Sequence, residues 1–384
     1  MQFQFSTSAQ ILFGNGTHKE IGTIAKPLGK KALLVTGGGG AKPDQINRLL
    51  DEAGIAWKSF LVLGEPSVEL IQDAVQFART EKCDFVIAFG GGSVLDSGKA
   101  ISAMLTNDGK LLDYLEVVGK GMPLLNRAAP MIAIPTTAGT GTEVTKNAVL
   151  LVTEKRVKVS MRSAWMTPSI ALIDPELTIS MPPAVTASSG MDALTQVIEP
   201  YVSSKANAMT DLFAREGIQR AARSLQEAYQ HGGNLTARED MAWASLLGGL
   251  CLANAGLGAV HGFAGPLGGM FDAPHGAVCA RLLPIVCAMN VQALRERAPE
   301  HISLPRYQEI ASMLTGNATA QIKDGIALLQ ALARTLQIPG LANYGITQDD
   351  IPLIVEKSRN SSSMKGNPIE LTDEELSEIL TQAL

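Results

Sequence analysis

Strands and helices alternate in the first half of the chain, and this alternation limits the fold more than any other feature of the sequence. Four apolar runs typical of strands occupy residues 31–37, 57–63, 84–92 and 131–139. Amphipathic runs typical of helices occupy 43–54, 67–83 and 93–107. Strands that alternate with helices form βαβ units, so the first half is predicted to be an α/β domain with a parallel sheet.

Strand patterns stop after residues 170–183, and the rest of the chain is predicted to be helical. We therefore expect two domains, an α/β domain over residues 1–182 and an all-helical domain over residues 183–384, with Pro182 and Pro183 marking the boundary. The expected helices are 186–203, 207–231, 237–257, 277–290, 302–314, 318–336, 348–358 and 372–383.

Charge and cysteine content narrow the class of protein. Lys and Arg number 32 against 37 Asp and Glu, so the formal charge is −5 and the basic footprint of a nucleic-acid-binding protein is missing. Four scattered cysteines are typical of free thiols in a reducing compartment, and the N-terminal segment lacks a signal-peptide pattern, so we expect a cytoplasmic protein. Residues 241–260 have the length of a membrane span, but their glycines and polar residues favour a buried helix, and no membrane partner is expected.

Two segments after predicted strands favour a nucleotide site. In GGGSVLDSGK (90–99), Gly91 and Gly92 allow close approach to a pyrophosphate, and Ser93 and the N–H groups of the following helix offer donors. PTTAGTGTEVT (135–145) adds threonine hydroxyls that suit phosphate and carboxamide groups. Each segment alone is also compatible with a plain turn or loop. Two of them at the carboxyl ends of strands in one sheet are typical of a nucleotide crevice.

A third glycine run, TGGGG (36–40), ends the first predicted strand. In dinucleotide-binding folds an acidic residue near such a strand end binds the ribose 2′-hydroxyl, and its absence leaves room for a 2′-phosphate. Gly37 and Gly38 carry no carboxylate, and Lys42 follows closely. Unless the run is only a flexible loop, it favours NADP(H) over NAD(H).

Two of the five histidines, His261 and His275, lie in one compact segment that is almost free of charge. On a continuous helix they would be ~21 Å apart. Gly268, Gly269 and Pro274 are expected to turn the chain so that the two rings converge. Two satisfied core histidines remain the alternative interpretation.

The segment MDALTQVIEP (191–200) supplies oxygen ligands for the same site. Asp192 and Gln196 lie four residues apart on a predicted helix and share a face. A carboxylate, an amide oxygen and two imidazoles suit catalytic Zn²⁺ or Fe²⁺. A negative charge near a helix N-terminus would also explain Asp192 without a metal.

Seven segments together resemble the iron-containing (group III) alcohol dehydrogenase family, which shares its fold with glycerol dehydrogenase and dehydroquinate synthase. The resemblance implies a Rossmann-like dinucleotide-binding domain followed by a helical domain for metal and substrate. In chain order the segments are GGGSVLDSGKA (90–100), PTTAGTGTEVT (135–145), RVKVS (156–160), IALIDPELTISMPP (170–183), GMDALTQVIEPYVS (190–203), VHGFAGPLGGMFDAPHGAV (260–278) and MKGNPIELT (364–372).

Carried over by position, the resemblance implies a set of site residues. The metal ligands would be Asp192, Gln196, His261 and His275, with Asp192, His261 and His275 also counted as catalytic. Gly91, Gly92 and Ser93 would surround the pyrophosphate, and Lys158 would lie near the nicotinamide ribose. The full set of expected cofactor-binding residues is Gly37, Gly38, Gly91, Gly92, Ser93, Asp96, Thr136, Thr137, Thr140 and Lys158.

Two positions depart from the family pattern, because Gln196 replaces the histidine of DALTH and Gly265 replaces a histidine that often follows the first ligand histidine. The resemblance implies reversible hydride transfer between a small-molecule alcohol or aldehyde and NADP(H) or NAD(H), assisted by Fe²⁺ or Zn²⁺, in a homo-oligomer. The alternatives are a metal-independent keto-acid reductase with Arg162 and Lys146 binding an anion, a dehydroquinate synthase-type lyase, and a non-catalytic binding protein.

Overall fold

The computed structural model describes residues 2–40, 42–155 and 157–384, which divide into two compact units. The sheet unit comprises residues 6–137 and 141–181, and the helical unit comprises residues 2–5, 138–140 and 182–384. The expected boundary lay between residues 182 and 183. The helical unit begins one residue earlier and takes in two short segments of the first half.

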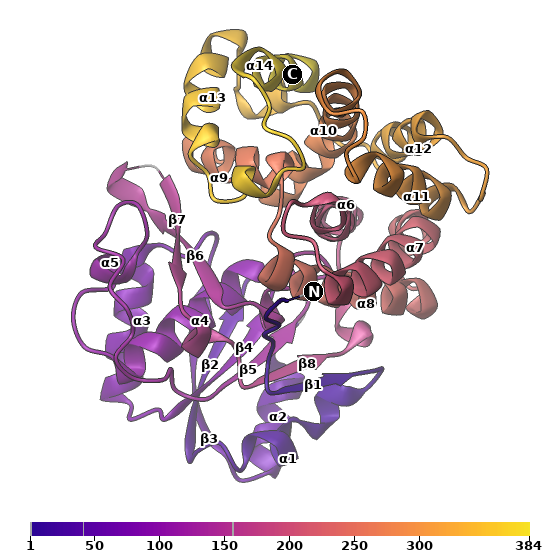
Figure 1. Ribbon diagram of the computed structural model, residues 1–384. Coiled ribbons are helices and arrows are strands. Elements are labelled where there is room, and N and C mark those ends of the chain that lie inside the picture. The colour runs from indigo at the N-terminus through magenta and orange to yellow at the C-terminus, as the bar shows by residue number, and fades with distance from the viewer. Residues whose placement is uncertain (1, 41, 156) are drawn as a thin grey trace. The chain divides into compact units, whose positions relative to one another are not determined.

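The described strands of the sheet unit form a six-stranded parallel sheet with the order β1-β8-β5-β4-β2-β3 (Figure 1), which confirms the predicted fold class. The chain places β3 on one side of β2 and β4 on the other, so the winding direction reverses between β2 and β4. Such a reversal creates a ligand crevice at the carboxyl ends of the two strands. The strands are β1 (Gln10–Phe13), β2 (Lys31–Gly37), β3 (Ala56–Val62), β4 (Phe85–Gly90), β5 (Met131–Pro135) and β8 (Ile170–Ile173).

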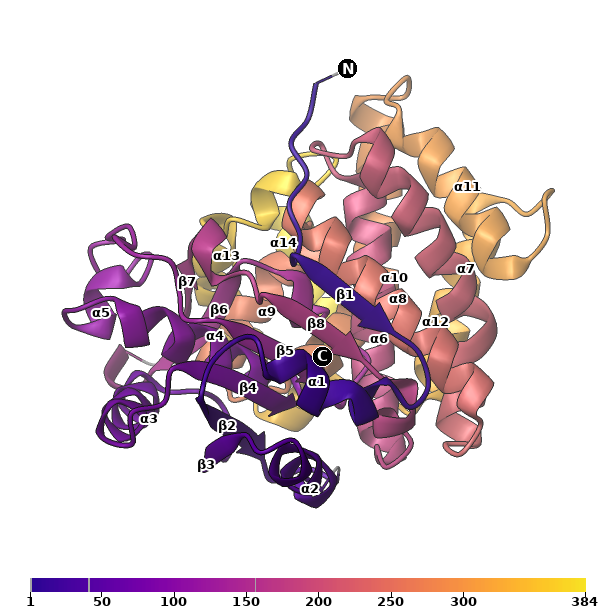
Figure 2. The same ribbon diagram turned by 90° about the horizontal axis from the view of Figure 1, so that it is seen from below.

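Helices cover both faces of this sheet, and each face has its own buried core. Leu33 and Val35 of β2 belong to the core under α3 (Val68–Thr80) and α4 (Gly92–Thr106). The alternate residues of the strand pack under α1 (Ile21–Ala25) and α2 (Asp44–Glu52), and Figure 2 shows β2 and β3 between α3 and α2. Burial on both faces explains why β2, β4, β5 and β8 are continuous apolar runs in the sequence.

An antiparallel hairpin of β6 (Asn147–Val152) and β7 (Val157–Arg162) completes the sheet unit with the short helix α5 (Leu111–Tyr114). The sequence patterns did not predict these elements. The hairpin is tied to α4 through Asp96, whose Oδ2 accepts the N–H of Val149 at 2.8 Å and whose Oδ1 lies 3.0 Å from Nζ of buried Lys99. The two buried charges compensate each other, as ions removed from water must.

The described residues of the helical unit form nine α-helices, one more than the sequence predicted. The addition is α9, which includes Gly268 and Gly269, so the expectation that these glycines turn the chain is wrong, and the turn lies at residues 271–274. The helices are α6 (Pro183–Val202), α7 (Ala208–Gln230), α8 (Leu235–Ala255), α9 (Ala259–Met270), α10 (His275–Arg297), α11 (Ser303–Thr315), α12 (Ile322–Thr335), α13 (Ile351–Arg359) and α14 (Asp373–Ala383).

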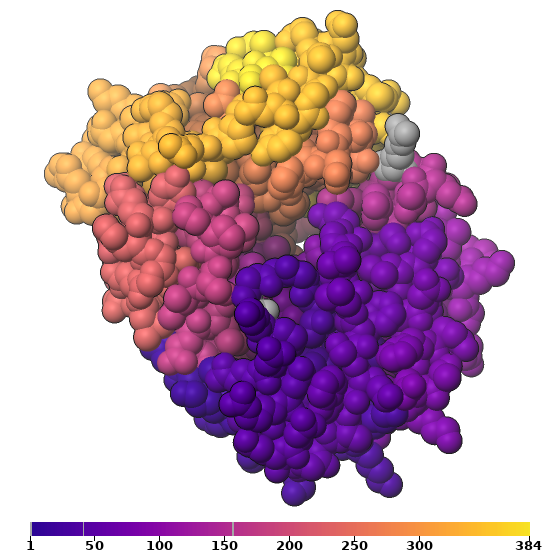
Figure 3. Space-filling view, turned by 180° about the vertical axis from the view of Figure 1, so that it is seen from behind, coloured from indigo at the N-terminus to yellow at the C-terminus, as the bar shows by residue number. Residues whose placement is uncertain are grey.

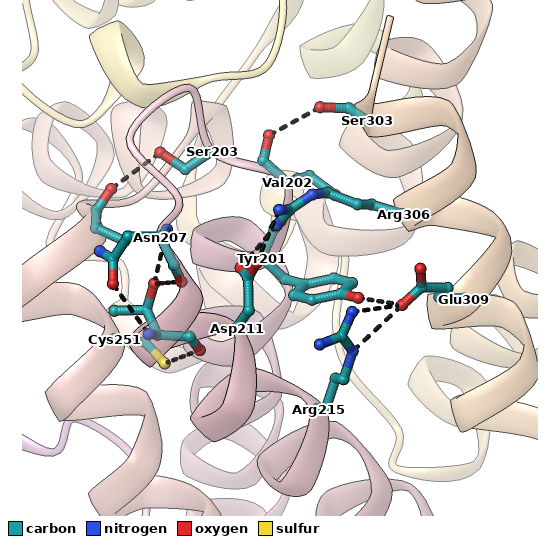
Figure 4. A network of polar contacts seen from close by, with 12 residues as sticks. Tyr201, Val202, Ser203, Asn207, Asp211, Arg215, Cys251, Ser303, Arg306 and Glu309 are labelled. Carbon is teal, nitrogen blue, oxygen red and sulfur yellow. Dashed lines mark hydrogen bonds and ion pairs between the residues drawn. The ribbon is translucent and has the colours of Figure 1, made fainter. Parts of the chain in front are cut away.

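Charged side chains hold the C-terminal end of α6 against α7 and α11 (Figure 4). Arg306 donates to the backbone oxygen of Tyr201 at 2.6 Å and to Oδ1 of Asp211 at 2.7 Å. The Tyr201 hydroxyl donates to Glu309, whose carboxylate also pairs with Arg215 at 3.0 Å. These bonds fix the position of α6 within the helical unit.

Apolar helices occupy the interior of the helical unit. By length and composition alone, α10 is the one described helix that is able to cross a membrane, yet 78% of its most apolar window is buried inside the protein. The apolar stretch over 241–260 is not one straight helix, because α8 and α9 meet at a bend of 99°. The C-terminal helix α14 packs on α10 and α13, and Figure 3 shows this last segment, in yellow, at the surface of the helical unit.

Candidate functional site

Helix α6 presents two carboxylates and an amide from one buried face. Asp192, Gln196 and Glu199 lie at intervals of four and three residues, and their exposed fractions are 1%, 1% and 5%. Residues at this spacing share a helix face. Buried carboxylates need a partner that compensates their charge, so the elements facing α6 determine what this surface does.

The imidazole of His261, on α9, lies between the two carboxylates of α6. Its Nε2 atom is 3.2 Å from Oδ1 of Asp192, and its Nδ1 atom is 2.7 Å from Oε2 of Glu199. A carboxylate on one ring nitrogen fixes the ring so that the other nitrogen is free to bind a metal. Glu199 is therefore a positioning residue of the site, a role that the sequence analysis did not predict.

The first turn of α9 is held by the same region of the protein. The N–H of Val260 donates to Oε1 of Glu199 at 2.7 Å, and the N–H of Ala259 donates to Oδ1 of Asn367 at 3.2 Å. These bonds satisfy two of the N–H groups that a helix leaves open at its start. A Cβ at Gly258 would lie 2.9 Å from Glu199 Oε1 and 3.0 Å from Asn367 Oδ1, so this approach requires glycine.

Helix α10 contributes two further donors from its first turn. His275 begins the helix and Cys279 follows one turn later, with Sγ of Cys279 3.7 Å from Nε2 of His275 and 3.8 Å from Nε2 of His261. The centroids of the two imidazole rings are 5.3 Å apart, so the predicted convergence of His261 and His275 is correct. Cys279 was not predicted; its position four residues after His275 on a helix was the available signal.

The four side chains suit a divalent metal ion. Asp192, His261, His275 and Cys279 each offer a ligand atom, and these atoms all lie within 4.8 Å of one another. Oδ1 of Asp192 is fully buried and accepts no hydrogen bond. In a tetrahedral site with bonds of about 2.0–2.3 Å, donor atoms are about 3.3–3.6 Å apart, close to the observed separations of 3.2–3.8 Å.

Gln196 faces the same region with a side chain of fixed orientation. Its Nε2 atom donates to the backbone oxygen of Gly139 at 2.8 Å, and its Oε1 atom is buried without a hydrogen-bond partner. The bond to Gly139 determines which end of the amide is oxygen. The free amide oxygen keeps Gln196 as a candidate ligand.

The surroundings of the two histidines favour positive charge on their rings. Burial acts to lower the pKa of His275, but the Cys279 sulfur and the Asp192 carboxylate outweigh it and raise that pKa to about 9. Burial acts to raise the pKa of Asp192, and the two histidines outweigh it and lower that pKa. A cation that binds here replaces protons on the ligands.

A second cluster of carboxylate and histidine side chains lies in the sheet unit, and its carboxylate has a different role from that of Asp192. His18 contacts Asp174, and the Asp174 oxygens also accept the N–H groups of Gly16 at 3.1 Å and His18 at 3.1 Å. These bonds use the carboxylate to join the segment after β1 to the end of β8. The group is structural.

The glycines predicted to bind the cofactor lie at the winding reversal of the sheet. Gly37 ends β2 and Gly38 follows it, while β4 ends at Gly90 and α4 begins at Gly92. A Cβ at Gly91 would lie 3.4 Å from Cγ2 of Thr137. The carboxyl ends of the two neighbouring strands and the N-terminus of α4 thus form the arrangement that dinucleotide folds use for a pyrophosphate.

The other predicted cofactor residues differ in their surroundings. Thr136 follows β5, and its N–H donates to the oxygen of Gly90 at 2.9 Å, whereas Thr140 belongs to the helical unit. Both oxygens of Asp96 are engaged by Val149, Thr142 and Lys99. Lys158, on β7, pairs with Glu65 at 3.0 Å.

Comparison with known proteins decides the family. The sequence matches the family described as iron-containing alcohol dehydrogenase over residues 8–175, and its C-terminal family over residues 186–384. The chain belongs to the iron-containing alcohol dehydrogenase family.

Individual relatives of this family member are named as oxidoreductases that act on alcohols. It is 37% identical over 380 residues to 1,3-propanediol dehydrogenase of Klebsiella pneumoniae, covering 97% of this chain and 96% of that one. It is 34% identical over 391 residues to the NADPH-dependent butanol dehydrogenase of Clostridium saccharobutylicum, covering 98% and 96%. The crystal structure of 1,3-propanediol oxidoreductase matches with a TM-score of 0.92 at 37% identity, covering all of both chains. The predicted enzyme class, an oxidoreductase acting on CH–OH groups, is confirmed.

The family assignment leaves little support for an anion-binding reductase that works without metal. Its candidate Arg162 lies on β7 and pairs with Glu116 at 3.0 Å, so its charge is already compensated. The iron-containing family and the buried donor cluster both point to metal chemistry instead.

Proposed function

We propose that this alcohol dehydrogenase is metal-dependent and nicotinamide-linked, and that it interconverts a small alcohol and its aldehyde. The observation that supports this most directly is the cluster of Asp192, His261, His275 and Cys279 with an unpartnered buried carboxylate oxygen. A bound divalent cation, Fe²⁺ or Zn²⁺, supplies a Lewis acid for the oxygen of the substrate, and the nicotinamide carries the hydride.

The residues of this chain hold and orient the reacting groups. We propose Asp192, His261 and His275 as metal ligands, with Gln196 Oε1 as a further donor and Glu199 fixing the ring of His261. The His275 side chain is 42% exposed, whereas those of Asp192 and His261 are buried, so substrate reaches the cluster from the His275 side. A Cβ at Gly265 would meet no atom within 4 Å, so there is room for water at this position, and we propose that water rather than a side chain passes the proton there.

For the cofactor we propose NADP(H) over NAD(H). Gly37, at the end of β2, has no carboxylate to repel a 2′-phosphate. Gly38, Gly91, Gly92, Ser93, Thr136, Thr137, Thr140 and Lys158 are proposed as further cofactor contacts. Asp96 would act by fixing the segment over 142–149 through its bonds to Thr142 and Val149. One similar enzyme is named as NADPH-dependent and another as NAD-dependent, so the proposal depends on the end of β2 and not on the relatives.

We further propose that the enzyme is a homo-oligomer, as its resemblance to the family implies, and that it is cytoplasmic, as its free cysteines indicate. Light scattering on the purified protein measures the oligomeric state. Fractionation of cells that express the chain at native level tests the compartment.

The decisive experiment measures metal content and activity in the same samples. Purified enzyme is analysed for iron and zinc and assayed with a panel of alcohols and aldehydes against both cofactors. We expect Asp192→Ala and His275→Ala to lose metal and turnover together, while His231→Ala, at an exposed histidine paired with Glu227, retains both. A metal-free variant with nearly unchanged turnover would exclude the Lewis-acid role.

A further inference from the structure

We infer that Cys279 is itself a metal ligand and makes the site selective for a thiophilic ion, Zn²⁺ rather than Fe²⁺. The inference rests on the proposed metal-dependent function and refines it. Thiolate sulfur favours Zn²⁺ among the divalent ions that mixed oxygen and nitrogen sites bind, and Zn²⁺ also stands above Fe²⁺ in general affinity.

The position of the sulfur supports the inference. Sγ of Cys279 lies 3.7 Å and 3.8 Å from the Nε2 atoms of His275 and His261. A sulfur and a nitrogen bound to one tetrahedral Zn²⁺ at about 2.3 Å and 2.0 Å are about 3.5 Å apart. The Nε2 atoms of both histidines therefore face the Cys279 sulfur and Oδ1 of Asp192 at the same time.

A second observation concerns the carboxylate of the same cluster. Oδ1 of Asp192, in a residue that is 1% exposed, points at both histidines without accepting a hydrogen bond. Burial of a carboxylate oxygen without a hydrogen bond is costly unless positive charge compensates it, and a bound metal ion supplies that charge when the histidines are neutral. The sulfur and this oxygen lie within one ligand set.

The other described cysteines have ordinary surroundings. Sγ of Cys83 donates to the oxygen of Ala32 at 3.6 Å, and Sγ of Cys251 donates to the oxygen of Thr210 at 3.5 Å. Cys287 is buried two turns after Cys279 on the same helix and lines a cavity of about 10 Å³ behind Glu199. Cys287 thus provides a matched control on α10.

The charge of the donor set also changes with the sulfur. When metal binds, the thiol and the protonated imidazoles release their protons to solvent, and the thiolate and the Asp192 carboxylate together neutralise the divalent ion. Gln196 provides only a neutral amide oxygen at the position where the family pattern has histidine. Cys279 thereby offsets the weak donor at position 196.

Cobalt substitution tests the inference, because a cobalt–thiolate bond gives an intense charge-transfer band in the near ultraviolet. Apo-enzyme is titrated with Co²⁺, and Zn²⁺ and Fe²⁺ affinities are measured anaerobically against a competing chelator. We expect the sulfur band in the wild type and in Cys287→Ser. We expect Cys279→Ser to lose the band and to lose Zn²⁺ affinity by more than about tenfold, with a smaller loss for Fe²⁺.

The possible outcomes separate this inference from the proposed function. Cobalt bound with no sulfur band in the wild type, or a band that persists in Cys279→Ser, overturns the role of Cys279 and leaves the metal-dependent function intact. Failure of the wild type to bind cobalt, zinc or iron overturns both. Cys279→Asp guards against misfolding of the serine variant, because it keeps an anionic donor: it should bind metal without the sulfur band.

Discussion

The Oε2 atom of Glu199 lies 2.7 Å from Nδ1 of His261, and the other oxygen of the same carboxylate accepts the N–H of Val260. One side chain of α6 therefore sets both the start of α9 and the orientation of the first imidazole that α9 carries. This pair links the packing of two helices directly to the geometry of the proposed metal site.

Replacement of this carboxylate tests its positioning role. Glu199→Gln removes the charge that faces Nδ1 of His261, so we expect metal affinity to fall about 10- to 100-fold, as for other partners of metal-bound histidines. Competition with a chelator measures the change. Glu216→Gln, at a half-buried glutamate that pairs with Arg220, is the control and should bind metal normally. Equal affinity in the two variants would show that the orientation of His261 is fixed by other contacts.

The choice between cofactors depends on the end of β2. A carboxylate introduced by Gly37→Asp should repel the 2′-phosphate and bind a 2′-hydroxyl, which lowers the NADP(H)-to-NAD(H) preference by about tenfold or more. A Cβ at Gly37 would lie 2.9 Å from Cγ2 of Val94, so the substitution needs Val94→Ala to make room. Values of kcat/KM with both cofactors are compared between Val94→Ala and the double variant. An unchanged ratio of the kcat/KM values with the two cofactors would mean that the ribose binds away from Gly37.

The packing of α4 on the sheet requires a glycine at position 98. A Cβ there would lie 2.6 Å from Cβ of Ala88 and 2.8 Å from Cε of Met131. Gly98→Ala should therefore reduce the free energy of unfolding by about 1–3 kcal/mol, measured by urea denaturation. Gly39→Ala, where a Cβ meets no atom within 4 Å, should change it little. Equal stability of the two variants would mean that α4 moves to make room for the added methyl group without a loss of stability.

Glu143 makes the stability of the sheet unit depend on pH. Burial raises the pKa of this carboxyl from its usual 4.5 to about 7, with Lys99 opposing the shift. The folded protein thus holds a proton that the unfolded chain releases, and the resulting stability is complete below about pH 4.5 and disappears as pH rises through about 7.

Substitution of Glu143 removes this dependence. Between about pH 5.5 and 8 the wild type should lose roughly 2 kcal/mol relative to Glu143→Gln, whose amide does not titrate. Denaturant unfolding of both proteins across this range provides the comparison, and Glu154→Gln, at an exposed site, serves as the control. Parallel pH profiles for wild type and Glu143→Gln would refute the prediction.

The elements that the sequence predicted well have strong local patterns. β2 lies at 31–37 as expected, because an apolar run between polar ends marks a strand buried on both faces. Helix α9 escaped prediction because glycines and Pro266 weaken its local preference, and its first turn is stabilised by Glu199 and Asn367 from distant segments. The hairpin β6–β7 depends in the same way on Asp96 of α4.

The site residues show the same difference between strong local patterns and contacts from distant segments. Asp192, His261 and His275 were identifiable because carboxylates and imidazoles are rare in an apolar region of the chain. The role of Glu199 depends on a helix that the sequence did not predict. Cys279 resembled the other buried cysteines until α10 placed its sulfur beside two ring nitrogens.

The donors of the cluster come from α6, α9 and α10, all within the helical unit. An ion bound by these donors would cross-link the chain between residues 192 and 279, in addition to acting on the substrate. Removal of the ion would therefore break a link that joins all three helices. Chelated enzyme should accordingly open to proteases among these helices while the sheet still resists them.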